Sequence, residues 1–356
     1  MIESVKMLFR GLGALAASIV LVAGCLIVVK AQNPAASASQ VSELVARVRA
    51  ASLNDAALSE ALALGQSLIH EKRFAEAAEL FGAVLDKNRD DPVALYGAAL
   101  SAFNLGKTSE AESLARAAVA ATTTSGSSDL PANKKTRAAD ALVLLAVVLA
   151  VRGDDPGALK SAQQAVRIAP DHFDAQFTLG RALYSVGDIS AAVQAFRVTV
   201  SLNPSDARAL FFLGTTFERA GDLESALRTY RELIVKQPDA PQGHLGVGTV
   251  LVRRGGMQME EGIEALKRAV AIEPDLYEAR VALGRALVSK GRAAESLEHL
   301  IRASELAPRN PEPQYQLSLA YRRLRRYDKA AEATAAVKRI HESRRTSGAS
   351  RKPSEP

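Results

Sequence analysis

The sequence predicts an all-α protein: an α-solenoid, a right-handed superhelix of about eight helical hairpins, preceded by an N-terminal transmembrane or signal helix. One observation is composition, because 48% of the residues are hydrophobic but only 5% are aromatic, and Trp is absent. Ala, Leu and Val therefore dominate, which favours closely packed helices. Another is a proline that recurs about every 34 residues from Pro170 onwards. In addition, no run of alternating β-branched residues ends at an Asn-Gly or Asp-Gly turn.

Residues 1–31 are typical of a targeting or membrane-anchoring segment. Lys6 and Arg10 precede an uncharged stretch that runs from Gly11 to Val29. A helix of this length spans roughly 28 Å, which is close to the hydrocarbon thickness of a bilayer. Because the stretch is apolar on every side, it is unlike the helices of a soluble core. We therefore expect export or membrane insertion.

Three fates are open for this segment. An uncleaved anchor with its N-terminus inside is favoured by the length and by Lys6 and Arg10. A cleaved signal and a secreted product form the second alternative, because small residues precede Gln32. A lipoprotein is the third, because Val-Ala-Gly before Cys25 resembles a bacterial lipobox with an acylated cysteine. In the favoured case the chain belongs to a bacterial envelope, the repeats face the periplasm or exterior, and residues 32–57 form an Ala/Ser-rich tether.

The chain beyond residue 57 is built of sequence repeats. Prolines at successive spacings of 34, 34, 36 and 34 residues follow apolar helix patterns: Pro170, Pro204, Pro238, Pro274 and Pro308. Proline cannot continue a helix, so these residues indicate turns between hairpins. Midway between the prolines, pairs such as Gly187-Asp188 and Gly221-Asp222 join a residue that tolerates a left-handed backbone to a good N-cap. Each unit is therefore predicted to hold two helices.

Small residues recur where the two helices of each unit approach most closely. Glycine stands at the eighth position (Gly65, Gly180, Gly214, Gly248, Gly284) and alanine at the twentieth (Ala77, Ala111, Ala158, Ala192, Ala226, Ala330), with a large residue at position 24. The agreement of period, glycine, alanine and proline resembles the tetratricopeptide repeat (TPR) family. The units are 58–91, 92–125, 139–172, 173–206, 207–240, 241–276, 277–310 and 311–344.

Departures from the repeat pattern suggest the organisation of the chain. The sixth unit has two extra residues near Gly255 and Gly256, which lengthen the turn between its helices. The last unit has Ser318 in place of the glycine, as expected of a terminal repeat with a polar surface. The predicted parts are an anchor or signal (1–31), a tether (32–57), units one and two (58–125), an inserted loop (126–138), units three to eight (139–344) and a basic, disordered tail (345–356).

Catalytic, metal and cofactor sites are not predicted. The five histidines are scattered over different repeats, and we interpret them as surface residues. No pair has the spacing of a helix-borne zinc site, and the only cysteine lies in the apolar N-terminal segment. Gly246 and Gly248 lie within a helix pattern and lack the context of a nucleotide-binding loop. We expect no enzyme activity, no cofactor and no small-molecule substrate.

The resemblance implies a binding function. In this family the first helices of the hairpins line a concave groove, and the groove-facing residues in this register are Phe177, Arg181, Tyr184, Phe211, Thr215, Arg219, Arg285, Tyr315 and Arg322. Aromatic and arginine side chains are enriched at protein interfaces. The expected ligand is a protein or peptide that is partly apolar and acidic. In the alternative interpretation Phe177 and Phe211 pack between repeats and the arginines are only solvated.

Basic residues concentrate at the C-terminal end of the chain. Residues 311–356 hold 11 Lys/Arg and 5 Asp/Glu, whereas the preceding 310 residues hold 34 of each. A solubilising cap is the favoured interpretation, and contact with an anionic membrane is the alternative. The tail has no aromatic residue on which bases could stack, so nucleic acid is not an expected partner.

The predicted function is a protein–protein interaction scaffold of the cell envelope. Its ligand would occupy the groove, and its N-terminal segment would supply the membrane attachment. The alternative is an accessory or regulatory subunit of an envelope enzyme or of a secretion or polysaccharide assembly.

Overall fold

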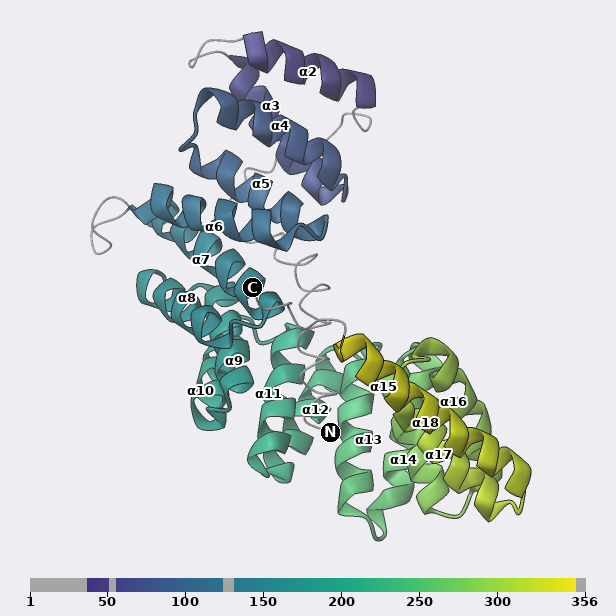
Figure 1. Ribbon diagram of the computed structural model, residues 1–356. Coiled ribbons are helices and arrows are strands. Elements are labelled where there is room, and N and C mark those ends of the chain that lie inside the picture. The colour runs from purple at the N-terminus through teal and green to yellow at the C-terminus, as the bar shows by residue number, and fades with distance from the viewer. Residues whose placement is uncertain (1–36, 51–55, 124–130, 350–356) are drawn as a thin grey trace. The chain divides into compact units, whose positions relative to one another are not determined.

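The computed structural model describes residues 37–50, 56–123 and 131–349, in which the regular elements are all α-helices (Figure 1). The helices are α2 (Ala38–Ala50), α3 (Ala56–His70), α4 (Phe74–Lys87), α5 (Pro92–Asn104), α6 (Thr108–Thr123), α7 (Ala132–Arg152), α8 (Asp155–Ile168), α9 (Phe173–Val186), α10 (Ile189–Leu202), α11 (Ala207–Ala220), α12 (Leu223–Lys236), α13 (Pro241–Arg254), α14 (Gln258–Ile272), α15 (Tyr277–Ser289), α16 (Ala293–Leu306), α17 (Pro311–Arg323) and α18 (Tyr327–Ala349). From α3 onwards they pair into the eight predicted hairpins. The predicted anchor, residues 1–31, lies outside the described residues; within those residues no helix is long and apolar enough to cross a bilayer.

The helices belong to two compact units, Met1–Asn203 and Pro204–Pro356. Among the described residues, unit 1 holds α2 to α10 and unit 2 holds α11 to α18. Within each unit the second helix of one hairpin packs against the first helix of the next, as α4 does on α5 and α12 on α13. An isolated hairpin could not bury its apolar stripe, so each is stabilised by its neighbours.

Five of the hairpins close on a contact between a glycine of the first helix and a large side chain of the second. Tyr230 of α12 is fully buried and lies against Gly214 of α11 and Gly246 of α13. A Cβ atom added at Gly214 would lie 2.5 Å from the Tyr230 ring, which is too close for any side chain. Phe81 of α4 has the same relation to Gly65 and Gly97. The glycines therefore set how closely successive helices approach.

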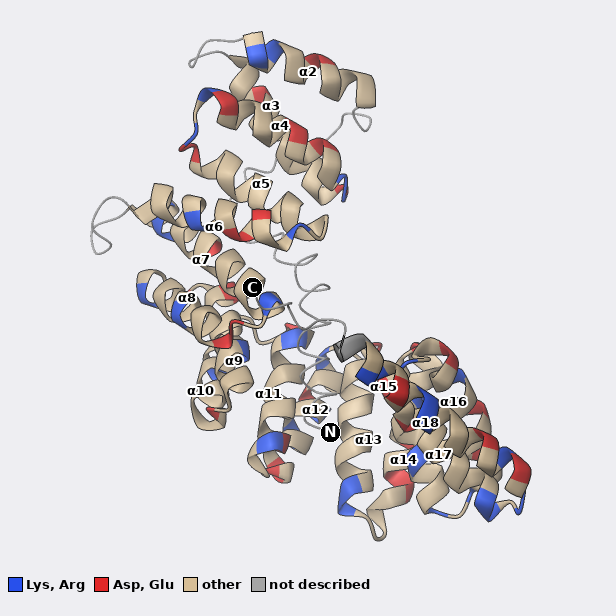
Figure 2. Cartoon of the chain, in the orientation of Figure 1, with Lys and Arg blue, Asp and Glu red and all other residues tan. Residues whose placement is uncertain are grey.

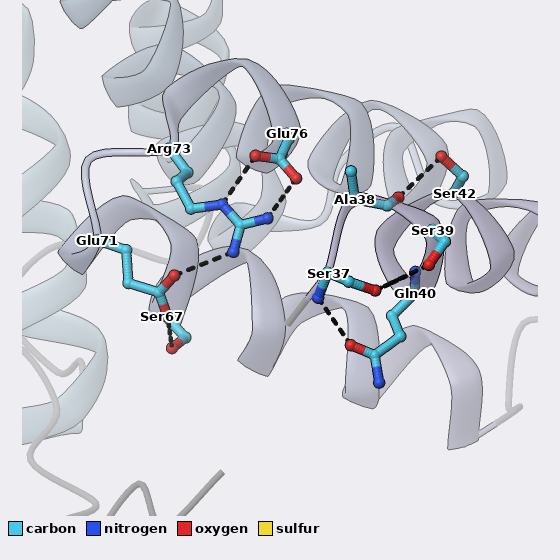
Figure 3. Close-up of polar contacts among 9 residues, drawn as sticks. All are labelled: Ser37, Ala38, Ser39, Gln40, Ser42, Ser67, Glu71, Arg73 and Glu76. Carbon is cyan, nitrogen blue, oxygen red and sulfur yellow. Dashed lines mark hydrogen bonds and ion pairs between the residues drawn. The ribbon is translucent and has the colours of Figure 1, made fainter. Parts of the chain in front are cut away.

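The turns inside the hairpins need a left-handed residue. Gly187 ends α9 with φ 94°, and the next residue, Asp188, accepts a hydrogen bond from the Ala191 N–H at the start of α10. Lys72 occupies the corresponding turn of the first hairpin with φ 61°, although it carries a side chain. Beside it, the Arg73 guanidinium pairs with Glu71 and Glu76 on the two sides of the turn (Figure 3). We infer that these ion pairs help to hold the strained turn closed.

The predicted tether contains a helix that covers the first repeat, contrary to our expectation. Helix α2 buries Val41, Leu44, Val45 and Val48 against the core of the first hairpins. This i, i+3, i+4, i+7 pattern is that of an amphipathic helix. Local hydrogen bonds hold the start of α2. One of them joins the Ser37 N–H, as the donor, to Gln40 Oε1 (Figure 3). Because the segment is rich in Ala and Ser, we did not predict that a helix covers the first repeat.

The predicted loop 126–138 is likewise partly helical. Helix α7 begins at Ala132, directly after Pro131, whose carbonyl accepts from the Lys134 and Lys135 N–H groups. Helix α6 packs against α7, and Leu95, Ala118 and Ala141 share one core cluster. The insertion thus does not interrupt the stack inside unit 1.

The C-terminal end replaces apolar residues by polar ones. Leu300 and Val288 of the seventh repeat are buried, and the residues 34 positions later are Thr334 and Arg322. No further repeat follows within the described residues, so these positions meet solvent. Helix α18 continues to Ala349, and so the first part of the tail that we predicted as disordered (345–356) is helical.

Lys72→Gly is expected to stabilise the protein. A residue with a Cβ at positive φ costs on the order of 1 kcal/mol that glycine does not. The melting temperature should rise by a few degrees, and Gly187→Ala should lower it. Lys72→Ala separates strain from charge because it retains the Cβ. An equal gain from Lys72→Ala and Lys72→Gly would show that the backbone at this turn is not strained.

Candidate functional site

The nine residues predicted to face the groove lie on four first helices of the hairpins. Phe177, Arg181 and Tyr184 are on α9 of unit 1. Unit 2 holds Phe211, Thr215 and Arg219 on α11, Arg285 on α15, and Tyr315 and Arg322 on α17. The structure therefore distributes them over two units, which are described in turn.

The predicted groove residues of unit 1 are largely packed inside it. The Phe177 side chain is only 4% exposed, stacks on Phe173 at 6.2 Å and meets the edge of Phe196 at 5.8 Å. Tyr184 is buried as well. Burial of the Arg181 guanidinium lowers its pKa to about 10. Phe177 thus contacts rings of its own repeat, whereas the alternative interpretation expected packing between adjacent repeats.

Arg181 and Tyr184 line a small cavity between α7 and α9. Its volume is about 40 Å³, and its other walls are Ala146, Val147, Ala150, Val151, Asp155, Ala158, Thr178, Ala182 and Ser185. The Ser185 hydroxyl donates to Asp155 across 3.0 Å, which ties α9 to α8. A space of this size holds a few water molecules but not a large side chain. The cavity is therefore not a peptide pocket as it stands.

His172 is not the surface residue that we expected. Its side chain is 9% exposed and caps α9, since Nδ1 accepts from the Ala175 N–H at 3.2 Å. Its Nε2 atom lies 3.1 Å from Asp140 Oδ1 on α7. Burial lowers the pKa of His172, but the bond to Asp140 and the charge of Asp174 outweigh it and raise the pKa above its ordinary value. The only sequence signal was its place before a helix start.

In unit 2 two of the predicted residues of α11, Phe211 and Thr215, join an internal network. Phe211 is buried against Tyr230, with ring centres 6.1 Å apart. The Tyr230 hydroxyl donates to Glu218 Oε1 at 2.7 Å and lies 3.1 Å from the Thr215 hydroxyl. Desolvation raises the pKa of Glu218, although the Tyr230 hydrogen bond and the charge of Arg253 oppose the shift. Phe211 and Thr215 thus hold the fifth repeat together.

Arg285, Tyr315 and Arg322 lie exposed on two neighbouring helices, whereas Arg219, the fourth exposed residue of the predicted set, lies on α11. Helix α15 carries Arg285 and packs against α17, which carries Tyr315 and Arg322. The Tyr315 side chain is 51% exposed. Neither Arg285 nor Arg322 has an ion-pair partner among the described residues. We name Arg285, Tyr315 and Arg322 the groove cluster.

Acidic residues lie at the opposite end of the same two helices. Glu278 and Glu312 stand at the second positions of α15 and α17, whereas Arg322 lies in the last turn of α17. Desolvation raises the pKa of Glu278, and Glu312 accepts a hydrogen bond from Gln316 at 3.0 Å. Figure 2 colours the basic and acidic residues along the chain. Such a polar surface can fix the direction of a bound chain.

Arg323, the neighbour of Arg322, has a structural role. It donates to the Val288 carbonyl near the end of α15, which also accepts from the Gly291 N–H, and so ties α17 to α15. Among the described residues no group of three His, Cys, Asp or Glu side chains could hold a metal ion. The exposed groups of the groove cluster are thus guanidinium donors and a phenol, which bind carboxylates and apolar surface.

Comparison with known sequences finds one kind of repeat. Family models described as tetratricopeptide repeat match residues 132–173, 177–241 and 214–277, and, for a second such model, 68–126 and 258–312. Together they cover about two thirds of the chain. No curated protein matches the sequence.

Solved structures have the same fold. A tetratricopeptide repeat protein from Parabacteroides merdae is 15% identical with a TM-score of 0.57, over 74% of this chain and 98% of its own. A chain of the APC/C hetero-tetramer Cut9–Hcn1 is 14% identical with a TM-score of 0.55, over 79% of this chain and 54% of its own. A thermophilic TPR protein of Thermus thermophilus is 25% identical with a TM-score of 0.44, over 51% of this chain and 98% of its own. The similarity to the first two structures shows a shared fold and nothing about function.

Glu218→Gln is expected to stabilise the protein at neutral pH. Because folding raises the pKa of Glu218, the folded state favours the protonated carboxyl, and ionisation at pH 7 reduces stability. Gln still accepts from Tyr230. The melting temperature should rise by a few degrees at pH 7, and the gain should vanish as the pH falls below the ordinary value of 4.5. Glu332→Gln, at an exposed position of α18, is the matched control. A lower melting temperature for Glu218→Gln at pH 7 would mean that the carboxylate stabilises the fold.

Proposed function

The chain belongs to the tetratricopeptide repeat family, and from this membership we propose that it is a scaffold that binds a partner protein or peptide through the groove cluster of unit 2. TPR proteins generally mediate protein–protein interactions, and the fold is generally a non-catalytic scaffold. The proposal therefore contains no reaction step.

The exposure of Arg285, Tyr315 and Arg322 on adjacent helices carries this proposal. Other predicted groove residues, such as Phe177 and Phe211, are buried in the packing of their own repeats, so a ligand could contact them only after the repeats opened. The groove cluster needs no such opening. An exposed aromatic ring and two arginines on one pair of packed helices are the side-chain mixture that often dominates interface energies.

The ligand that fits is an acidic segment with an apolar side chain. Guanidinium groups bind carboxylates through paired hydrogen bonds, and Tyr315 offers a rigid apolar surface. The carboxylates of the ligand would lie toward Arg322, because Glu278 and Glu312 repel them at the other end of α15 and α17. This difference in charge between the two ends of α15 and α17 favours one direction of the bound ligand.

A location at the cell envelope is part of the proposal. The uncharged stretch from Gly11 to Val29, with Lys6 and Arg10 before it, supports an N-terminal anchor with the repeats on the periplasmic or exterior side. If the segment were cleaved, or if Cys25 were lipidated, the repeats would lie on the same side of the membrane. They would then be released or held by a lipid instead of by a helix.

A peptide-display selection tests the groove cluster. Random peptides selected on the full chain should be enriched in Asp and Glu together with apolar residues. Their affinity, measured by fluorescence anisotropy, should fall at least tenfold, by about 1.4 kcal/mol, for Arg285→Glu and for Tyr315→Ala. Arg268→Glu on α14 is the matched control, because Arg268 is exposed on a second helix.

Two results would contradict the groove proposal. One is a selection enriched in basic peptides. The other is an equal loss of affinity with Arg285→Glu and Arg268→Glu, because a general change of charge would then explain the effect.

The mass of the chain isolated from a bacterial host, recorded for wild type and Cys25→Ser, tests the attachment. A retained anchor predicts the full-length mass for both. A lipoprotein predicts a truncated, acylated wild type and an unprocessed Cys25→Ser variant. An unacylated product that begins at Gln32 in both variants would contradict the anchor and indicate secretion.

A further inference from the structure

One edge of unit 2 is formed by the turns inside its hairpins. The turns between α13 and α14, α15 and α16, and α17 and α18 follow the last residues of three first helices, which pack on one another in consecutive repeats. We name the residues 255–257, 290–292 and 324–329 the turn edge. It lies outside the groove cluster, and the inference drawn from it is independent of the proposed function.

Charge is the first property of the turn edge. Its exposed cations are Lys290, Arg325, Arg326 and Lys329. Among the described residues none of these four forms an ion pair with a carboxylate; Lys329 lies 5.9 Å from the centre of the Tyr321 ring. Arg292, by contrast, pairs with Glu260 and Glu295. Asp328 is the exposed acid of the turn edge, and Glu260, Glu261 and Glu295 stand beside the edge in the first turns of α14 and α16. These three glutamates pair with Arg231 or Arg292, so the turn edge itself retains a net positive charge.

Exposed apolar surface is the second property. Met257 is 99% exposed in the turn that the two extra residues of the sixth repeat lengthen. Tyr327 is 67% exposed at the first position of α18, directly after Arg325 and Arg326. A single exposed apolar residue is ordinary on a protein surface. Here, however, Met257 and Tyr327 lie on the same edge as the cations without ion-pair partners. Both stand at turns, from which a side chain can enter an apolar environment.

We propose that the turn edge binds the surface of an anionic phospholipid bilayer. Each basic side chain near such a surface contributes about 1 kcal/mol of attraction, and several are needed for stable association. Methionine enters the acyl boundary readily, and tyrosine is favoured at the level of the headgroups. The edge presents separate cations and single apolar side chains at its turns, and its one exposed aromatic ring is no platform for successive bases. These features favour a bilayer over an acidic protein or a nucleic acid.

A fluorescence experiment on the full chain tests this proposal. In a Cys25→Ser background, Met257→Cys carries a polarity-sensitive fluorophore, and vesicles contain phosphatidylcholine alone or mixed with phosphatidylglycerol. The emission should shift to the blue with the anionic vesicles only, and high salt should reverse the shift. The same label at Val235→Cys reports the opposite end of the hairpins, since Val235 is 80% exposed near the end of α12. That label should not respond.

Charge variants complete the test. Arg326→Glu with Lys329→Glu places one acid directly before α18 and one in its first turn, where a helix tolerates acids. This pair should weaken vesicle binding on the order of 100-fold. Lys160→Glu with Arg167→Glu changes the net charge equally on exposed positions of α8 and should weaken binding less than about threefold.

Three outcomes would overturn the proposal. The first is an equal blue shift with neutral vesicles, which would indicate apolar partitioning through another segment such as the N-terminal residues. The second is unchanged binding by the Arg326→Glu, Lys329→Glu variant. The third is a blue shift of the Met257 label as large with single-stranded RNA or with polyglutamate, because the turn edge would then recognise a different polyanion.

Discussion

Close contact between a glycine and a large side chain recurs in five of the hairpins, and the spacing of their helices depends on it. Tyr230 touches Gly214 of its own hairpin and Gly246 of the next, and Phe81 lies between its own pair of glycines in the same way. Only a residue without a Cβ leaves room for the ring. The contact sets the spacing of the helices, and this spacing lets each hairpin bury its apolar stripe against a neighbour. Loss of one such contact would therefore affect two repeats.

This constraint also limits which residues can bind a partner. Phe177 and Phe211 lie beside the lodged rings of Phe196 and Tyr230 and are drawn into the same packing. Charged side chains are constrained differently, because many cross from one repeat to the next, as Arg231 does to Glu261. The residues available to bind a partner are those that neither pack inside the repeats nor form ion pairs. In unit 2 these include the groove cluster and the turn edge, which differ in shape and hence in the partners that they fit.

The residues that were misjudged share a physical cause. Helix α2 has the apolar spacing of an amphipathic helix, but the predominance of Ala and Ser suggested a tether. Helix α7 begins seven residues before the expected repeat boundary, because Pro131 offers a good helix start and the following residues favour helix. His172 was judged by its isolation in sequence, whereas its partner Asp140 lies on a neighbouring helix. Composition and spacing along the chain could not reveal contacts made across it.

The sequence by itself determined the repeat period, the eight hairpins and the positions of their turns. These features depend on local physical chemistry: proline ends a helix, glycine permits a left-handed turn, and small residues allow close approach. The tertiary structure alone decided which members of the predicted groove are accessible. Phe211 and Tyr315 occupy the same position in their repeats, yet Phe211 is buried and Tyr315 is exposed. Exposure depends on the neighbouring side chains that pack over a residue, and equivalent positions in different repeats have different neighbours.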